Sequence, residues 1–180
     1  EAISGTSTGA MNAVVLADGL MRGGTEGARD RLGAFWRRVS QEGSNAGAAG
    51  DIVKSMLGFW HLQAFSPFSF FEQFSNFLSP YRTNPLNINP LRDLIGHLID
   101  FRNVRANDGL KLFLSATNVR TGKIKVFSGD EVTADAVMAS ACLPYLFQAV
   151  EIGKEAYWDG GYTGNPALFP FFEETETADI

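Results

Sequence analysis

The sequence is poor in the residue types on which disulfides, metal sites and nucleic-acid surfaces depend. Its 180 residues include one cysteine, Cys142, and two histidines, His61 and His97. This set allows no disulfide within the chain and indicates no zinc site. The formal net charge is −5, whereas a nucleic-acid surface needs clustered positive charge. We therefore expect no metal, no cofactor and no nucleic-acid partner.

Long hydrophobic runs are also scarce. One long uncharged run, residues 2 to 17, is interrupted by Gly5 and Gly9 and contains Ser, Thr and Asn, and no transmembrane helix is expected. The chain has neither an initiator methionine nor a recognisable leader peptide. We expect a piece of a longer domain, with sequence missing before Glu1 and after Ile180. The single cysteine leaves the compartment open, and we favour the cytoplasm or the membrane periphery over secretion.

The hydrophobic pattern predicts one mixed α/β domain in which helices alternate with strands and hairpins. Gly23 and Gly24 separate two of the helices, and Asn89 and Thr133 are typical N-caps for two more. The helices expected from these signals cover residues 8–21, 25–39, 90–101 and 134–143. A short apolar strand is expected at the start of the chain, running into a turn at Gly5, and the further strands expected from β-rich runs are 111–118, 123–128, 147–152 and 155–158.

A segment of unusual composition lies between the second and third of these helices. Residues 41–51 are small and polar, which is typical of a mobile loop, and residues 59–81 hold nine aromatic side chains. The aromatic residues indicate either a folded helical subdomain with its Phe side chains inside, or a wall that faces an acyl chain or a membrane. We expect an aromatic-rich helical cap or insertion at about residues 41–85.

The motif Gly5-Thr6-Ser7-Thr8-Gly9 lies between the first strand and the first helix. A serine on such a sharp turn exposes its hydroxyl, and the helix N-terminus points N–H groups at a developing oxyanion. Glycines allow the backbone to make the turn. The motif alone is short enough to occur by chance, but the strand before it and the buried helix after it favour a nucleophile.

The base for this serine is sought among the remaining titratable residues. In the α/β-hydrolase order a histidine follows the acid, but no histidine lies beyond His97, so both histidines are interpreted as packing or surface residues. Asp159 is the best candidate, because Gly160 and Gly161 let the backbone bend next to it and burial would raise its pKa. A simple Asp-Gly-Gly turn is the alternative. The other aspartates, in helices or polar loops, are interpreted as solvated: Asp18, Asp51, Asp93, Asp100, Asp108, Asp130, Asp135 and Asp179.

Three stretches together resemble the patatin-like phospholipase family. They are ISGTSTGAMNA at the start, LSATNVRTGKIKVF in the middle and ASACLPYLFQAVEIGKEAYWDGGYTGNPAL, which ends at Leu168. Their order and separation are more specific than any one of them. Asn12 and Asn165 lie within these stretches and are interpreted as structural, and Cys142 as a small buried residue.

The resemblance implies a three-layer α/β/α sandwich around a mixed central sheet, incomplete at both ends. It also implies a lipid acyl hydrolase with a Ser-Asp dyad, in which Ser7 is the nucleophile and Asp159 the general base. Thr8 would supply an oxyanion N–H, and further donors would lie upstream of Glu1. Because the loss of one such donor costs about 100-fold to 1000-fold in rate, we expect this piece alone to be inactive.

Other functions remain open from the sequence. The acyl group could pass to an alcohol in place of water, which would make the protein an acyltransferase. The GTSTG turn could bind an anion at a helix N-terminus without catalysis, although the Lys of a phosphate-binding loop is missing. A catalytically inactive lipid-binding module is a further alternative. The expected partners are a lipid or phospholipid acyl ester and, at most, a membrane surface.

Overall fold

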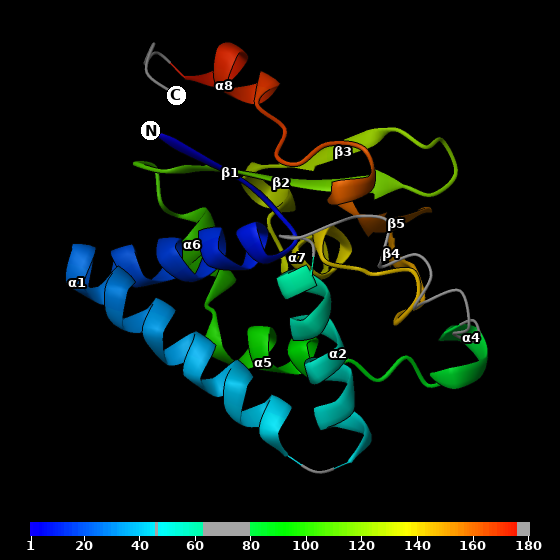
Figure 1. Cartoon of the computed structure of the whole chain (residues 1–180). Helices are drawn as coiled ribbons and strands as arrows, with labels where there is room; N and C mark the ends of the chain where they lie inside the picture. Colours follow the sequence, from blue (N-terminus) through cyan, green and yellow to red (C-terminus); the bar gives the residue numbers. More distant parts are fainter. Residues whose placement is uncertain (46, 63–79, 176–180) are drawn as a thin grey trace.

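The computed structural model describes residues 1–45, 47–62 and 80–175, which form a mixed five-stranded sheet with helices packed against it (Figure 1). The predicted mixed α/β fold is thereby confirmed. The strands are β1 (Ala2–Thr6), β2 (Lys111–Asn118), β3 (Ile124–Phe127), β4 (Val150–Ile152) and β5 (Glu155–Asp159). The helices are α1 (Thr8–Ser44), α2 (Ala48–Leu62), α4 (Pro80–Thr83), α5 (Pro90–Leu98), α6 (Phe101–Arg105), α7 (Ala134–Ser140) and α8 (Phe169–Glu174), with short 3-10 helices η1 (Gly129–Glu131) and η2 (Gly160–Tyr162).

Strand β2 is the centre of the sheet and pairs along both edges. Strand β3 lies antiparallel along one edge, where Leu114 pairs with Phe127. The other edge carries two strands end to end: the parallel β1 pairs with residues 111–115, and the antiparallel β5 pairs with residues 116–118. Every residue of β2 except Lys111 is buried, as expected for a strand covered on both faces.

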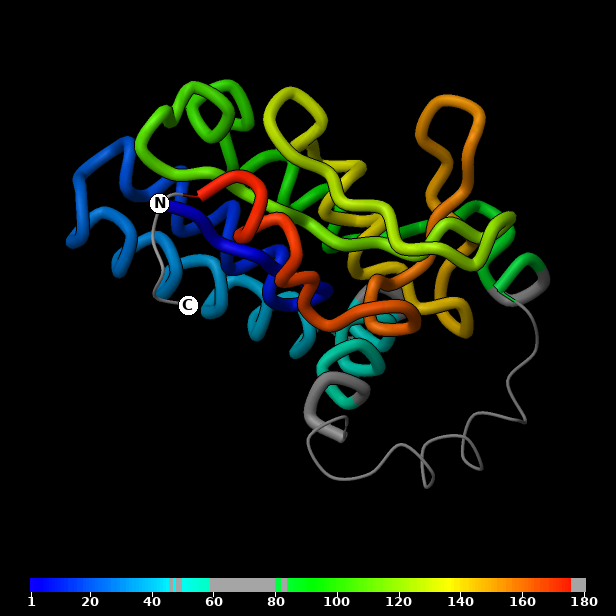
Figure 2. Tube along the Cα trace, turned by 90° about the horizontal axis from the view of Figure 1, so that it is seen from above, coloured from blue at the N-terminus to red at the C-terminus, as the bar shows by residue number. Residues whose placement is uncertain are grey.

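The two faces of β2 have different partners because its side chains alternate. Leu112, Leu114 and Ala116 join the main hydrophobic core, which also contains buried side chains of α1 and α7. On the opposite face Phe113 packs edge-on against Phe171 of α8, with their ring centroids 5.9 Å apart. Figure 1 shows α1, α5 and α7 below the sheet and α8 above it, and Figure 2 shows the C-terminal segment running over β1 and β2.

Helix α1 is sharply kinked where the sequence predicts a break between two helices. Gly23 and Gly24 have non-helical backbones, and Gly24 has a φ of 59°, which glycine adopts without a steric cost. The second half of α1 turns back past the first half (Figure 1). Gly19 and Gly27 allow this close approach, because a Cβ atom on Gly19 would lie 2.5 Å from the Cα of Ala28.

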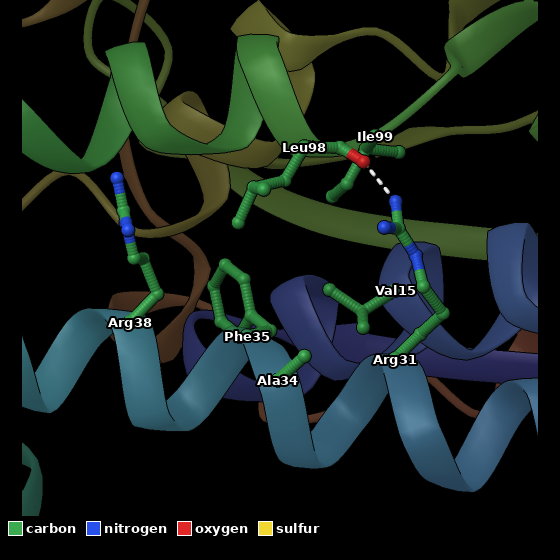
Figure 3. Close-up of a pocket in the computed structure, with 7 residues that line it drawn as sticks. All are labelled: Val15, Arg31, Ala34, Phe35, Arg38, Leu98 and Ile99. Carbon is green, nitrogen blue, oxygen red and sulfur yellow. Dashed lines mark hydrogen bonds between the residues drawn. The ribbon is translucent and has the colours of Figure 1, made fainter.

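A buried carboxylate joins the two halves of α1, which corrects the prediction that Asp18 is solvated. Asp18 is fully buried and forms ion pairs with Arg22, at 3.0 Å, and with Arg31, at 2.6 Å. The Arg31 guanidinium also donates to the Leu98 carbonyl at the end of α5 (Figure 3). The sequence pattern shows Asp18 as one charge on a helix, and only the reversal of the chain at the kink brings Arg31 to it.

Several predicted boundaries are wrong. The helix expected at 134–143 ends at Ser140, and the strand expected at 147–152 begins at Val150. Residues 41–51 were expected to form a mobile loop, but α1 continues to Ser44 and α2 begins at Ala48. The helix expected at 90–101 ends at Leu98, because Asp100 accepts bonds from the Arg102 and Asn103 N–H groups and begins α6. Asp100 thus has a capping role, while its side chain is still 35% exposed. The aromatic segment 59–81 lies largely outside the described residues, so the interpretation of it as a cap, an acyl-facing wall or a membrane contact stays a prediction.

Candidate active site

The predicted nucleophile occupies a strained turn between β1 and α1. Ser7 has φ 56° and ψ −120°, a backbone conformation that costs a non-glycine residue about 1–3 kcal/mol. It stands at the N-cap position of α1, yet its side chain makes no capping hydrogen bond. The turn therefore holds the hydroxyl apart from the helix backbone and leaves it available for chemistry.

The two glycines of the motif have different surroundings. A Cβ atom on Gly5 would lie 2.6 Å from the carbonyl carbon and oxygen of Gly9, which is closer than any relaxed contact. Among the residues that the structure describes, a Cβ atom on Gly9 would meet nothing within 4 Å. Gly5 thus lets the end of β1 pass close to the first turn of α1, whereas no atom of the described residues requires a glycine at position 9.

Asp159 ends β5 and is held by three hydrogen bonds through its backbone and one carboxylate oxygen. Its N–H donates to the Cys142 carbonyl at 2.8 Å, and its carbonyl accepts from Thr117 Oγ1 at 2.8 Å. The Gly161 N–H donates to Oδ1 at 2.8 Å. Gly160 packs so tightly on β2 that a Cβ atom would lie 2.2 Å from the Ser115 carbonyl oxygen. The Asp-Gly-Gly sequence is therefore a turn, and it also fixes one carboxylate oxygen and leaves the other unbound.

Ser7 and Asp159 meet because β1 and β5 end next to each other on β2. Thr6 pairs with Ser115, and Asp159 pairs with the next residue, Ala116. Asp159 is only 2% exposed, and within the described residues neither its Oδ2 nor the Ser7 Oγ makes a hydrogen bond of ordinary geometry. Two buried polar atoms of this kind normally find partners, so a pair left free at a strained turn indicates a functional site.

The pKa of Asp159 is raised above its usual value, mainly because burial disfavours the charged carboxylate. The Ser7 hydroxyl and the Gly161 N–H oppose this shift, since both stabilise the charged form. The Ser7 hydroxyl is thus one of the groups that act on this pKa, although among the described residues Ser7 Oγ and Asp159 Oδ2 form no hydrogen bond. A carboxylate with a raised pKa is a better proton acceptor for an alcohol.

The remaining candidates are arranged as follows. Thr8 begins α1, so its N–H has no acceptor within the helix and its predicted oxyanion role stays a prediction. Cys142 is buried and its pKa is raised to about 12, which confirms it as a small unreactive core residue. His97 is exposed, and its Nδ1 lies 2.6 Å from the Asp93 carbonyl oxygen. The side chain of His61 lies outside the described residues.

One cavity is separate from this pair. It has a volume of about 190 Å³ and lies between the two halves of α1 and the end of α5 (Figure 3). Its lining side chains are Val15, Arg31, Ala34, Phe35, Arg38, Leu98 and Ile99. In the part of the chain that the structure describes, no group of acidic, cysteine and histidine residues forms a metal site, and no helix is long and apolar enough to cross a membrane.

Ser140 and Thr117 are site residues that sequence reasoning missed. The Ser140 hydroxyl accepts from the Ser7 N–H at 3.0 Å, and Thr117 anchors the Asp159 carbonyl. Ser140 does lie in the ASACLPY segment that contributes to the family resemblance. Asn12 was interpreted as a structural residue that satisfies turn or helix backbone. Its role is structural, but the partner is a side chain, because its Oδ1 accepts from the Trp36 indole N–H at 2.8 Å.

Comparison with known proteins gives one family match. The sequence model of the family described as patatin-like phospholipase matches residues 1–172 of the chain. A search of curated proteins found no significant match. The matched region contains both strand ends of the site and nearly the whole described fold.

Proposed function

Because this chain belongs to the patatin-like phospholipase family, a family of lipid acyl hydrolases, we propose that Ser7 and Asp159 are the catalytic dyad of such an enzyme. The observation that supports this proposal most is the pair of buried, unbonded oxygens, Ser7 Oγ and Asp159 Oδ2, at two adjacent strand ends. The substrates would be fatty-acyl esters of phospholipids or related lipids, cleaved by a phospholipase A type of reaction.

The proposed reaction has two halves. In the first, Ser7 Oγ attacks the ester carbonyl while its proton passes to Asp159 Oδ2, and the resulting oxyanion is stabilised by the Thr8 N–H and by donors from upstream sequence. The carbonyl re-forms as the bond to the alcohol breaks, and Asp159 returns its proton to that alcohol. In the second half, water loses a proton to Asp159 and attacks the acyl-serine carbonyl. The bond to Ser7 Oγ then breaks, Asp159 returns the proton to Ser7 Oγ, and the fatty acid is released.

The raised pKa of Asp159 suits this role. Gly161 holds Oδ1, whereas Oδ2 has no partner in the described part of the chain, so in this proposal Oδ2 takes the proton. In this proposal no histidine acts as an intermediary, and the proton passes directly between Ser7 and Asp159. A substrate of this class resides in membranes or micelles, so the proposal includes contact with a lipid surface and a location in the cytoplasm or at the membrane periphery.

A covalent serine probe tests the proposal. The protein, with its native flanking sequence, would be treated with a fluorophosphonate and the modified peptide mapped by mass spectrometry. We expect labelling of Ser7 that is lost in Ser7→Ala and in Asp159→Asn, followed by turnover of a phospholipid substrate. Labelling of another residue, or none in a protein shown to be folded, would contradict the dyad and favour a non-catalytic lipid- or anion-binding role. Acyl transfer would appear as an ester product when an alcohol is supplied.

A further inference from the structure

We propose that Ser140 is a positioning residue, which holds the strained backbone of Ser7 against β2, the strand on which the end of β5 with Asp159 is also paired. This inference rests on the proposed dyad and adds a residue to it. Ser140 is the last residue of α7 and is fully buried. It touches neither reacting oxygen and acts through the backbone.

The hydroxyl of Ser140 makes two hydrogen bonds, one as an acceptor and one as a donor, and so links Ser7 to Ser115. It accepts from the Ser7 N–H at 3.0 Å and donates its own proton to the Ser115 carbonyl at 2.6 Å. Both bonds are buried and join residues distant in sequence. A single hydroxyl thus satisfies a donor at the strained turn and an acceptor on β2.

The Ser115 carbonyl, which accepts the second of these hydrogen bonds, lies where both proposed catalytic residues are anchored on β2. Ser115 pairs with Thr6 at the end of β1, and its neighbour Ala116 pairs with Asp159 at the end of β5. The same carbonyl is also the atom on which Gly160 is packed. Ser140 therefore connects the nucleophile to the point on β2 where both halves of the dyad are anchored.

Without this hydroxyl the Ser7 N–H would be a buried donor with no partner. The strained backbone of Ser7 would then lose the hydrogen bond that offsets the cost of its conformation. The turn would relax and move the Ser7 Oγ relative to Asp159. A displacement of about 1 Å at a reacting group costs on the order of 100-fold in rate. The expected consequence is a slower chemical step with unchanged affinity for the substrate.

Ser4 provides a matched control. Its hydroxyl also donates to a backbone carbonyl, that of Ala167, at 2.6 Å, and it lies on β1 three residues before Ser7. Ser4 makes no hydrogen bond to Ser7 or Asp159. Replacement of Ser4 by alanine thus deletes a comparable hydroxyl-to-carbonyl bond from the same sheet without releasing the turn.

The test measures fluorophosphonate inactivation of wild type, Ser140→Ala and Ser4→Ala, with separate values for the maximal rate kinact and the binding constant KI. We expect Ser140→Ala to lower kinact by about 10-fold to 100-fold with little change in KI, and Ser4→Ala to leave both constants near wild type. Thermal unfolding of all three proteins establishes that they are folded. Wild-type kinact in a folded Ser140→Ala protein would overturn the proposal, as would an equal loss in Ser4→Ala.

The pH profile of kinact supplies a readout that a purely structural role would not move. The Ser7 hydroxyl lowers the pKa of Asp159, so a turn that has moved away raises the pH midpoint of labelling in Ser140→Ala and leaves it unchanged in Ser4→Ala. Cys142 and Tyr162 are the other titratable groups near Asp159 among the described residues, and burial raises the pKa of both. Both therefore stay protonated at the acidic to neutral pH values over which the labelling rate is followed.

Ser140→Cys covers the case in which the alanine variant does not fold. A thiol has a similar shape but is a weaker donor and acceptor, so we expect a smaller fall in kinact in the same direction. Wild-type kinact and pH midpoint in Ser140→Cys would contradict the inference. Failure of the dyad itself is distinguishable, because the wild-type protein would then show no labelling at Ser7.

Discussion

Thr6 and Asp159 are the last residues of two strands that run toward each other along the same edge of β2. Thr6 pairs with Ser115 and Asp159 with Ala116, so the two strand ends are neighbours although β1 is parallel and β5 antiparallel to β2. Each strand then turns away from the sheet, β1 into Ser7 and α1, and β5 into η2. The gap between the two ends is where the proposed nucleophile and base meet.

The pH dependence of labelling follows from the raised pKa of Asp159. A general base must be ionised, so we expect the rate of fluorophosphonate labelling to rise through one ionisation whose midpoint lies above the usual 3.8 and to be lost as the pH falls below it. Asp159→Asn should show no such step. A midpoint at or below 3.8 would indicate that burial does not govern this carboxyl.

Asp159→Asn should stabilise the fold at neutral pH while it removes activity. A carboxyl whose pKa is raised in the folded state contributes stability below pH 3.8, and this contribution is lost as the pH rises through the folded-state pKa. Asparagine keeps the acceptor for the Gly161 N–H and carries no buried charge. We expect a gain of about 1 kcal/mol in the free energy of unfolding at pH 7, which shrinks toward pH 4, measured by denaturant unfolding.

Glu155 is a control for that measurement, because its pKa is shifted in the opposite direction to that of Asp159. Its pKa is lowered by hydrogen bonds from Arg120 and Asn118, so its ionised form stabilises the fold above the usual pKa. Glu155→Gln should therefore lower the unfolding free energy at pH 7, with the difference disappearing as the pH falls through the lowered pKa. A loss of stability in Asp159→Asn as well would argue against a buried ionised carboxylate.

The two motif glycines should respond differently to alanine. In Gly5→Ala the new methyl group would lie 2.6 Å from the Gly9 backbone, and we expect a loss of about 3 kcal/mol in unfolding free energy together with loss of Ser7 labelling. Gly9→Ala places its methyl in open space within the first turn of α1, so we expect a gain of about 0.5–1 kcal/mol. Equal effects of the two variants would contradict the close approach of β1 and α1.

The ion pairs of Asp18 should matter for stability. Asp18→Asn removes the charge shared by Arg22 and Arg31, whose side chains are 46% and 28% exposed and therefore partly hydrated. We expect a loss of about 2 kcal/mol, below the range for fully buried pairs. Glu26→Gln is the control, because the Glu26–Arg29 pair is exposed and should contribute almost nothing. An unchanged free energy of unfolding in Asp18→Asn would show that the kink of α1 does not depend on this carboxylate.

Local sequence signals identified most of the secondary structure correctly. Thr133 caps α7 by accepting from the Ala136 N–H, and Asn89 caps α5, as their positions before apolar runs predict. Strand β2 has the predicted bounds of Lys111 and Asn118. These features depend on residues within one turn or one hairpin of each other, so the information needed for them is contiguous in the chain.

The sequence by itself determined that Ser7 stands between a strand and a helix and that Asp159 ends a strand before two glycines. Tertiary structure decided the rest: that β1 and β5 share one edge of β2, that Ser140 joins the Ser7 turn to Ser115, and that Arg31 reaches Asp18 across a kink. Each of these depends on contacts between residues distant in the chain. Each buried polar group needs a partner, because its burial without one costs free energy, and no local periodicity encodes where that partner lies.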